Sequence, residues 1–391
     1  MSLHLIMGLA GAVLLTVAAT YSTATFCAAL FFRFWHPRRA PPLRRPPVTL
    51  LKPLCGTEPD LYLNLRTFCL QDYPAYQIVF GVRDAADPAI AIVRRLMQEF
   101  PALPMKLVVN DAQHGGNRKI SNLINMLPYA RHELLIIADS DTRVRADYLD
   151  AVTQPLLDPE VGMVTCIYRC IPFAGIWSRL GSMYINDWYM PSVLLAWLFG
   201  HRGYASGQTM ALRRDTLDAV GGLEAVANQL ADDYRLCESV RRIGQRVVLS
   251  RYLLETVQSE PTAADLMDHE LRWMRTIRLL AGRSFNLLFV SFTLPLLGIG
   301  AALASAEPRL AWPLVALVSL TLVCRVGLSA LARLGQARIS LVDLGLLPLR
   351  DLLLCWIWSR ALVTSRVTWR GSEYEVDRQG VLRTALNPLP D

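Results

Sequence analysis

The chain has 391 residues, enough for one large domain or two smaller ones, and its mean hydropathy of +0.29 is high for a protein without membrane segments. The formal net charge of +7 suits an anionic membrane surface or an anionic substrate, and because no nucleic-acid recognition motif accompanies it, we expect no nucleic-acid partner. The eight cysteines show no paired CxxC spacing, which argues against a zinc site or a disulfide framework.

The N-terminal segment is predicted to cross a membrane. No Asp, Glu, Lys or Arg occurs between residues 1 and 32, whereas a helix of about 20 apolar residues already spans the bilayer core. The arginines that follow are Arg33, Arg38, Arg39, Arg44 and Arg45. By the positive-inside rule these arginines lie in the cytoplasm. We therefore expect a transmembrane helix over 1–33, a basic, proline-rich linker over 34–47 and a cytoplasmic domain over 48–282.

Strands and helices are predicted to alternate through the first part of that domain. The expected strands are Val48–Leu51, Gln77–Val82, Met105–Val109 and Leu134–Ile137, and the expected helices are Leu61–Leu70, Ala89–Phe100 and Ser121–Leu127. This alternation predicts an α/β, Rossmann-like fold with a parallel sheet and right-handed crossovers. The Gly-x-Gly-x-x-Gly fingerprint of dinucleotide enzymes is missing.

Two carboxylates follow the expected strand Leu134–Ile137, in the turn Asp139-Ser140-Asp141. Ligands of open α/β sheets bind at such strand ends, and paired carboxylates are hard oxygen ligands for Mg²⁺ or Mn²⁺, which can hold a diphosphate. An ordinary Asx turn at a strand end is the alternative interpretation. Asp84, after an earlier strand, could accept a hydrogen bond from a base or ribose, or could be a plain turn residue.

A second acidic pair, Asp232 and Asp233, precedes an expected helix over Tyr234–Ile243. Acidic residues at a helix start can stabilise the helix dipole, so a capping role is one interpretation. The other is catalytic, because a carboxylate here could remove a proton from an acceptor hydroxyl.

A basic-aromatic cluster follows in His269-Glu270-Leu271-Arg272-Trp273. Arg272 could stabilise charge on a leaving diphosphate, since its guanidinium binds two phosphate oxygens at once, and Trp273 could form a wall for the sugar or acceptor. The alternative is a membrane-interface anchor ahead of the next apolar stretch.

The C-terminal part contains two or three further membrane helices, predicted within 283–365. Ser284–Ala306 and Leu310–Leu334 are expected to cross the bilayer. Ile339–Val363 carries internal charges, so we interpret it as re-entrant or interfacial, with a cytoplasmic tail over 366–391. Trp188–Gly200 is too short to cross the membrane. The aromatic residues Trp177, Tyr184, Trp188 and Tyr189 are interpreted as an interfacial face, with core packing as the alternative.

Taken together, these motifs resemble the family-2-type glycosyltransferases of the GT-A fold, specifically the ceramide glucosyltransferase family (family 21). The stretches Tyr184–Trp188 and His269–Thr276 look most similar to a bacterial branch, the hopanoid-biosynthesis-associated glycosyltransferases. The family resemblance covers nearly the whole chain and rests on Leu50–Leu54, Asp72–Pro74, Arg83–Ile90, Asn117–Leu123, Asp139–Asp141, Gly221–Leu223, Ala231–Tyr234, His269–Trp273 and Thr368–Arg370.

The resemblance implies a role for each matching residue. Asp233 would be the catalytic base of an inverting transfer, and Asp139 and Asp141 would bind Mn²⁺ or Mg²⁺. The donor would be bound by Asp84, Lys119, Asp139, His269, Arg272 and Trp273. His269 departs from the family signature, which has Gln or Arg there, although a protonated histidine can also donate to phosphate.

The resulting hypothesis is a membrane-bound, metal-dependent hexosyltransferase. It would move glucose or N-acetylglucosamine from a UDP-sugar to a ceramide-like, hopanoid-associated or phospholipid acceptor, at the cytoplasmic face of a bacterial inner membrane. A processive polysaccharide synthase shares the same motifs but needs a channel of many spans. A non-catalytic, nucleotide-sugar-binding membrane protein is the third hypothesis.

Overall fold

The computed structural model describes residues 2–34, 44–307, 309, 311–333, 341–363, 366–369, 372–377 and 380–384. It falls into two compact units, each assembled from separate parts of the sequence. We call them the helical unit (Met1–Arg38, Ala174–His201 and Glu260–Ser365) and the sheet unit (Arg39–Phe173, Arg202–Ser259 and Arg366–Asp391).

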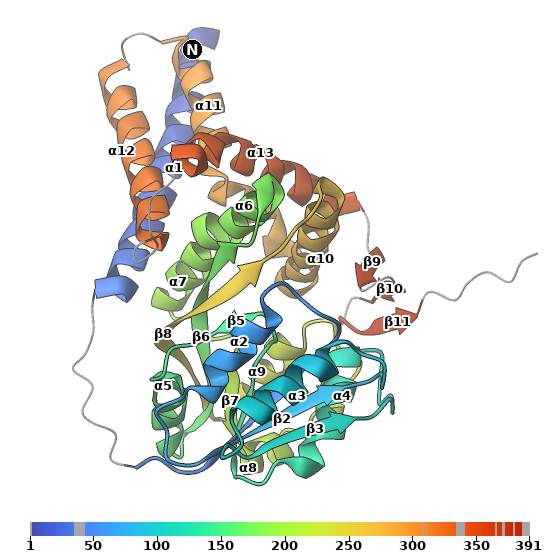
Figure 1. Cartoon of the computed structure of the whole chain (residues 1–391). Helices are drawn as coiled ribbons and strands as arrows, with labels where there is room; N and C mark the ends of the chain where they lie inside the picture. Colours follow the sequence, from blue (N-terminus) through green and yellow to red (C-terminus); the bar gives the residue numbers. More distant parts are fainter. Residues whose placement is uncertain are drawn as a thin grey trace, which may run out of the picture. The chain divides into compact units, whose positions relative to one another are not determined.

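The sheet unit is built on a mixed eight-stranded sheet with the strand order β3-β2-β1-β4-β7-β6-β8-β5 (Figure 1). The strands are β1 (Val48–Pro53), β2 (Tyr76–Val82), β3 (Met105–Val109), β4 (Leu134–Ile137), β5 (Thr142–Arg143), β6 (Val161–Pro172), β7 (Met210–Arg213) and β8 (Arg246–Gln258). The connecting helices are α2 (Leu61–Cys69), α3 (Ala89–Glu99), α4 (Arg118–Met126), α5 (Tyr148–Thr153), α8 (Arg214–Ala219) and α9 (Asp232–Arg242).

The predicted parallel half of this sheet is confirmed. Strand β1 pairs in parallel with both β2 and β4, and β2 pairs in parallel with β3. The apolar residues of β1 and β4 are buried on both faces, as expected for parallel strands covered by helices. The other half is antiparallel at β4–β7 and β7–β6, and then parallel between the long strands β6 and β8. This second half had no counterpart in the predictions.

The C-terminal segment adds a small antiparallel sheet to the sheet unit, made of β9 (Arg366–Trp369), β10 (Ser372–Val376) and β11 (Leu382–Thr384). The predicted tail over 366–391 is therefore structured in part. Its backbone contacts explain why: Leu382 N donates to Asn228 O at 2.8 Å, and Leu230 N donates to Gly380 O at 3.0 Å. Arg370 of the quoted motif lies outside the described residues.

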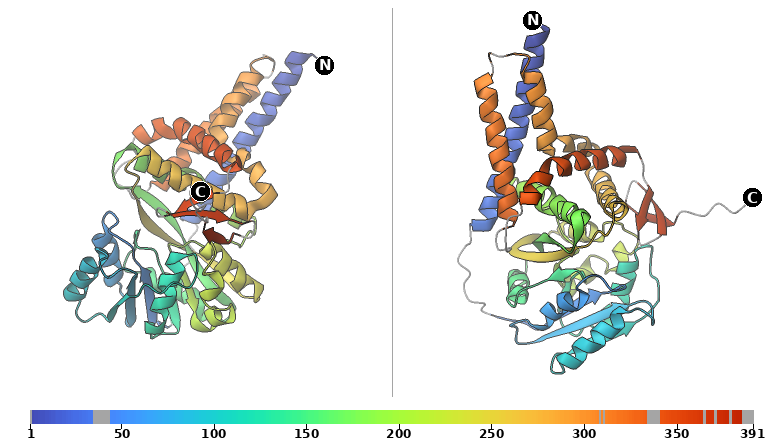
Figure 2. Two further views of the ribbon diagram at one scale, coloured as in Figure 1. Left: turned by 90° about the vertical axis from the view of Figure 1, so that its right-hand side faces the viewer. Right: turned by 45° about the horizontal axis from the view of Figure 1, so that its top comes forward.

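The helical unit contains α1 (Leu3–Phe34), α6 (Gly175–Met183), α7 (Met190–Leu198), α10 (Ala263–Ala281), α11 (Thr293–Ala304), α12 (Ala311–Ala332) and α13 (Leu341–Val363). Helices α1, α11 and α12 run side by side, and α13 lies across them (Figures 1 and 2). Small residues allow α1 and α11 to approach closely, because a Cβ on Gly11 would lie 2.5 Å from Ala304 N.

Two described helices, Leu3–Phe34 and Trp312–Ala332, are long and apolar enough to cross a membrane. The predicted span over Ser284–Ala306 is not one straight helix, and its crossing of the membrane stays a prediction. Its first part forms a 3₁₀ helix (Gly282–Ser291), and the helical segments on either side of Phe292 meet at 60°. Pro295 gives the physical reason, since proline has no N–H and its ring is compatible only with the first turn of α11.

The predicted single domain over 48–282 is divided between the two units, because residues 174–201 and 260–282 pack with the membrane helices. A continuous helical segment runs from α6 through a π-helical turn (Tyr184–Tyr189) into α7. Tyr184 and Trp188 are 1% and 5% exposed within the helical unit. For these two residues the interfacial interpretation is wrong, and the alternative, core packing, is confirmed.

Candidate active site

The turn that carries the first predicted acidic pair follows β4, near the middle of the main sheet. Its backbone is held by Lys52 of β1, which donates a hydrogen bond to the carbonyl oxygen of Asp139. Lys52 is completely buried, with Nζ 3.7 Å from the centre of the Phe68 ring. Burial lowers the pKa of Lys52 to about 7, although nearby carboxylates oppose that change.

Lys119 connects this turn to the second acidic pair. Its Nζ lies 2.6 Å from Oδ1 of Asp139 and 3.9 Å from Oδ2 of Asp232. Burial alone would lower the pKa of Lys119, but the carboxylates of Asp139 and Asp232 outweigh it and raise the pKa above its usual value. Lys119 therefore stays positively charged between the two acidic segments.

Helix α4 presents Lys119 because of the residue that starts it. Asn117 caps the helix by accepting a hydrogen bond from the N–H of Ile120 at 3.1 Å. The amide nitrogen of the same side chain donates to Oδ1 of Asp232 at 3.2 Å. A single asparagine thus fixes the start of α4 and orients the first residue of α9.

Asp233 lies in the first turn of α9 and is held by two backbone N–H groups. Gly207 N donates to its Oδ2 at 3.0 Å, and Tyr234 N donates to its Oδ1 at 2.7 Å. The residue at the helix cap is Ala231, so Asp233 does not act as the capping residue. Burial, together with the adjacent carboxylate of Asp232, raises the pKa of Asp233 to about 7.

Gly207 is required where these groups meet. A Cβ at this position would lie 2.8 Å from Nζ of Lys119 and 3.0 Å from Oδ2 of Asp139. Its backbone N–H reaches Asp233 at the same time. The sheet unit therefore brings Lys119, Asp139 and Asp233 together around one glycine.

Asp141 lies in a crowded group of carboxylates. Burial and the nearby charges of Glu58 and Asp139 raise its pKa to about 8. Glu58 also accepts a hydrogen bond from the Ser140 hydroxyl at 2.7 Å. A divalent cation would offset this repulsion, so Asp139 and Asp141 fit a metal whose other ligands come from phosphate or water. Among the described residues, no three or more Asp, Glu, His or Cys side chains form a complete metal site.

The surroundings of Asp84 differ from those of the carboxylates around Asp141. It is exposed after β2, and its Oδ1 accepts a hydrogen bond from Ala86 N at 2.8 Å. This is the plain turn that the sequence allowed as an alternative. Its predicted contact with the donor stays a prediction.

The remaining predicted donor residues, His269, Arg272 and Trp273, lie on α10 in the helical unit. His269 Nδ1 is 2.6 Å from Oε1 of Glu260, and the imidazole centre is 4.0 Å from the Trp273 ring. His269 thus pairs with the buried carboxylate of Glu260, which gives this departure from the family signature a structural role.

Four contributing residues were not singled out by the sequence reasoning. Lys52 could have been identified from the sequence, because a lysine inside an apolar strand needs a buried polar or charged partner. The other three (Glu58, Asn117 and Gly207) act through contacts with residues far away in the sequence, and local pattern gives no sign of such contacts.

The sequence model of glycosyl transferase family 21 matches residues 10–382. The chain belongs to this family. The match includes both units and every predicted site residue, and it confirms the resemblance drawn from the motifs. Family membership and the mixed sheet together support the predicted α/β fold of the GT-A type.

Two curated relatives from Caenorhabditis elegans are similar to this member of family 21. Ceramide glucosyltransferase 1 is 25% identical over 250 residues, which cover 63% of this chain and 53% of the relative. Ceramide glucosyltransferase 3 is 25% identical over 231 residues, which cover 59% of this chain and 50% of that relative. The chain thus spans about half the length of these curated relatives.

Solved structures are more distant. A mannosyltransferase from Pyrobaculum calidifontis, in complex with GDP-Man and Mn²⁺, is 19% identical with a TM-score of 0.47, over 89% of this chain and 96% of that one. Glucosyl-3-phosphoglycerate synthase from Mycobacterium tuberculosis, in complex with Mn²⁺, UDP and phosphoglyceric acid, is 14% identical with a TM-score of 0.40. The match covers 63% of this chain and 85% of that one.

Proposed function

We propose that this family 21 glycosyltransferase moves a hexose from a UDP-sugar to the hydroxyl group of a membrane lipid, with inversion at the anomeric carbon. The observation that carries the proposal is the meeting of Lys119, Asp139 and Asp233 around Gly207. It places a cation, a candidate metal ligand and a candidate base within one small region of the sheet unit.

Asp233 is the proposed base. Its two backbone hydrogen bonds fix the carboxylate, and a pKa of about 7 suits proton transfer near neutral pH. The acceptor hydroxyl gives its proton to Asp233 while its oxygen attacks the anomeric carbon of the donor. The bond between that carbon and the diphosphate breaks, and UDP leaves with the electron pair. Attack from the side opposite to UDP inverts the configuration.

The donor diphosphate needs positive charge as it leaves. Lys119 is the cation that the sheet unit holds next to Asp139, and Arg272 is proposed as the second. Asp139 and Asp141 would hold Mn²⁺ or Mg²⁺, which when bound neutralises diphosphate charge. Asp84 is proposed to contact the uridine, and His269 and Trp273 to contact the donor from α10.

The acceptor is proposed to be a lipid because the chain carries helices long and apolar enough to cross a membrane, and because relatives are named ceramide glucosyltransferases. Glucose and N-acetylglucosamine are the proposed sugars, and a ceramide-like, hopanoid-associated or phospholipid molecule the acceptor. The arginines after α1 favour a catalytic domain at the cytoplasmic face of a bacterial inner membrane.

The decisive test is Asp233→Asn in membranes supplied with radiolabelled UDP-glucose or UDP-N-acetylglucosamine and Mn²⁺. We expect the wild type to form a labelled lipid and the variant to lose about 10²- to 10⁴-fold in rate, because a general base typically contributes that much. UDP binding should persist in the variant, since the carboxylate is not a proposed donor ligand.

Asp111→Asn, in an exposed loop, is the matched control and should retain wild-type turnover. Undiminished glycolipid synthesis by Asp233→Asn would remove the base assignment. A wild type that binds UDP yet transfers neither sugar to any lipid would favour a nucleotide-sugar-binding protein.

A further inference from the structure

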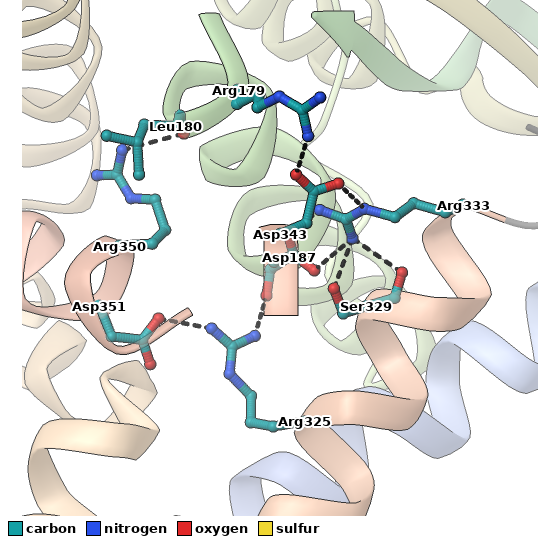
Figure 3. A network of polar contacts seen from close by, with 9 residues as sticks. All are labelled: Arg179, Leu180, Asp187, Arg325, Ser329, Arg333, Asp343, Arg350 and Asp351. Carbon is teal, nitrogen blue, oxygen red and sulfur yellow. Dashed lines mark hydrogen bonds and ion pairs between the residues drawn. The ribbon is translucent and has the colours of Figure 1, made fainter. Parts of the chain in front are cut away.

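Helix α13 carries three charged residues, Asp343, Arg350 and Asp351, that are buried or mostly buried in the helical unit, and each has a partner on another element (Figure 3). The partners of α13 come from α6, from α10 and from α12 or the residue just after it. The pairs are Asp343 with Arg179 and Arg333, Arg350 with Glu270, and Asp351 with Arg325, while Arg333 also binds Asp187. The formal charges of these eight residues cancel.

Such pairs are not explained by stability alone. Burying two charges costs several kcal/mol per ion, and apolar residues of similar volume are often as stable or more so. What a buried pair does provide is a defined geometry, because slippage leaves an uncompensated charge. On α13, Arg350 therefore fixes the contact with α10, whereas Asp343 and Asp351 fix the contacts with α6 and α12.

The Arg350–Glu270 pair is the one that reaches the α10 motif. Both side chains are 1% exposed, and the guanidinium binds the carboxylate through two parallel hydrogen bonds of 2.7 Å. Arg350 also donates to the carbonyl oxygen of Leu180 at 3.2 Å. A bidentate pair of this kind restrains orientation as well as distance.

Aromatic contacts extend the same anchor to the motif. The Arg350 guanidinium lies 5.6 Å from the Tyr184 ring centre, and Tyr184 lies 5.5 Å from the Trp273 ring. Trp273 in turn lies 4.0 Å from His269. One arginine of α13 is thus connected to a motif residue on α10 by an ion pair and by a short series of ring contacts.

We propose that the Glu270–Arg350 pair is a positioning device: α13 fixes the rotation of α10 about its axis and so sets the direction of Arg272 and Trp273. An α-helix turns about 100° per residue, so Arg272 points about 200° away from Glu270, nearly opposite the anchored face. Rotation of α10 at Glu270 would therefore displace Arg272 by the same angle. This inference rests on the proposed function, in which Arg272 and Trp273 contact the donor.

The test compares two double variants that each remove both charges of one buried pair. Glu270→Gln/Arg350→Met releases α10, whereas Arg325→Met/Asp351→Asn removes a similarly buried pair that does not touch α10. Neutralising both partners avoids an unpaired buried charge, so both variants should fold. We expect kcat/KM for the UDP-sugar to fall about 10²-fold in the first, as misplacement of about 1 Å can cause, and less than threefold in the control.

A second readout does not depend on turnover. Arg272→Cys is introduced into each background, with the exposed Cys27 and Cys55 replaced by serine, and its rate of reaction with a water-soluble maleimide is measured. We expect that rate to change several-fold in Glu270→Gln/Arg350→Met and to stay within twofold in the control. Arg350→Lys, which keeps the charge but loses the bidentate geometry, should give an intermediate kcat/KM.

The inference would be overturned if both double variants lost the same kcat/KM per folded molecule. The Glu270–Arg350 pair would then have a structural role alone. Unchanged labelling at position 272 would overturn it as well. If the wild type itself transfers no sugar, the proposed function fails, and the labelling comparison still decides whether the pair orients α10.

Discussion

At the scale of single residues, Asp233 combines two properties that a general base requires. Its carboxylate is fixed by the N–H groups of Gly207 and Tyr234, and it stays partly exposed, so an acceptor can reach it. Its raised pKa comes from burial and from Asp232, both of which disfavour the charged form. The same surroundings that position the base therefore also place its titration near neutral pH.

This titration predicts the acidic limb of the pH–rate profile. The base must be deprotonated to accept a proton, so kcat/KM should rise about tenfold per pH unit below pH 7 and level off above it. The measurement is kcat/KM for the lipid acceptor between pH 5.5 and 8.5 at saturating metal. Asp111→Asn should reproduce the wild-type curve, and a flat profile would speak against Asp233 as the base.

The carboxylate group around Asp141 predicts a dependence on divalent metal. We expect EDTA to abolish transfer and Mn²⁺ or Mg²⁺ to restore it, because a cation relieves the repulsion among Glu58, Asp139 and Asp141. Asp141→Asn should raise the metal concentration needed for half-maximal activity at least tenfold, read from metal titrations of sugar transfer. Asp147→Asn, at the exposed end of the following loop, is the control. Full activity in chelator would contradict the metal role.

The candidate site was predictable in its parts but not in its assembly. Asp139 and Asp233 stood out because each follows or starts a regular element, and Lys119 because the family motif contains it. Their meeting depends on Gly207, whose importance comes from the absence of a side chain beside Lys119 and Asp139. No local pattern distinguishes such a glycine from one in an ordinary turn.

At the scale of elements, the sequence predicts the first half of the main sheet well. Strands β1 to β4 match the expected ranges closely, since short apolar runs between turn residues are a strong signal of buried strands. The bend at Phe292 was missed because hydropathy counts apolar residues without regard to Pro295, which ends one helix and begins another. Composition predicts that a stretch is apolar but not that it is straight.

Helix α13 shows the complementary case. Its internal charges are the basis for predicting a re-entrant or interfacial segment, and this stays a prediction. What the sequence could not reveal is the partner of each charge, because residues such as Glu270 and Arg179 lie far away in the chain. Buried arginines and carboxylates balance across several helices, and only the folded arrangement shows which belong together.

At the scale of the whole molecule, the chain passes repeatedly between the two units. Residues 174–201 and 260–282 were assigned to the catalytic domain by their position between its motifs, yet they pack with α1, α12 and α13. Sequence order suggested one continuous domain, whereas burial of apolar side chains such as Tyr184 and Leu266 places these segments in the helical unit. The α10 motif is therefore built on the part of the protein that also carries the membrane helices.

The arginines after α1 predict the membrane topology of the whole protein. Positive charge next to a crossing helix stays in the cytoplasm, so the sheet unit should be cytoplasmic and Ser2 should face outward. The measurement uses Ala102→Cys, in an exposed turn after α3, and Ser2→Cys, each with Cys27 and Cys55 replaced by serine. A membrane-impermeant maleimide applied to intact cells should label position 2 at once and position 102 only after permeabilisation. Labelling of position 102 in intact cells would place the catalytic residues on the side of the membrane that lacks UDP-sugars, and it would exclude both the topology and the proposed donor.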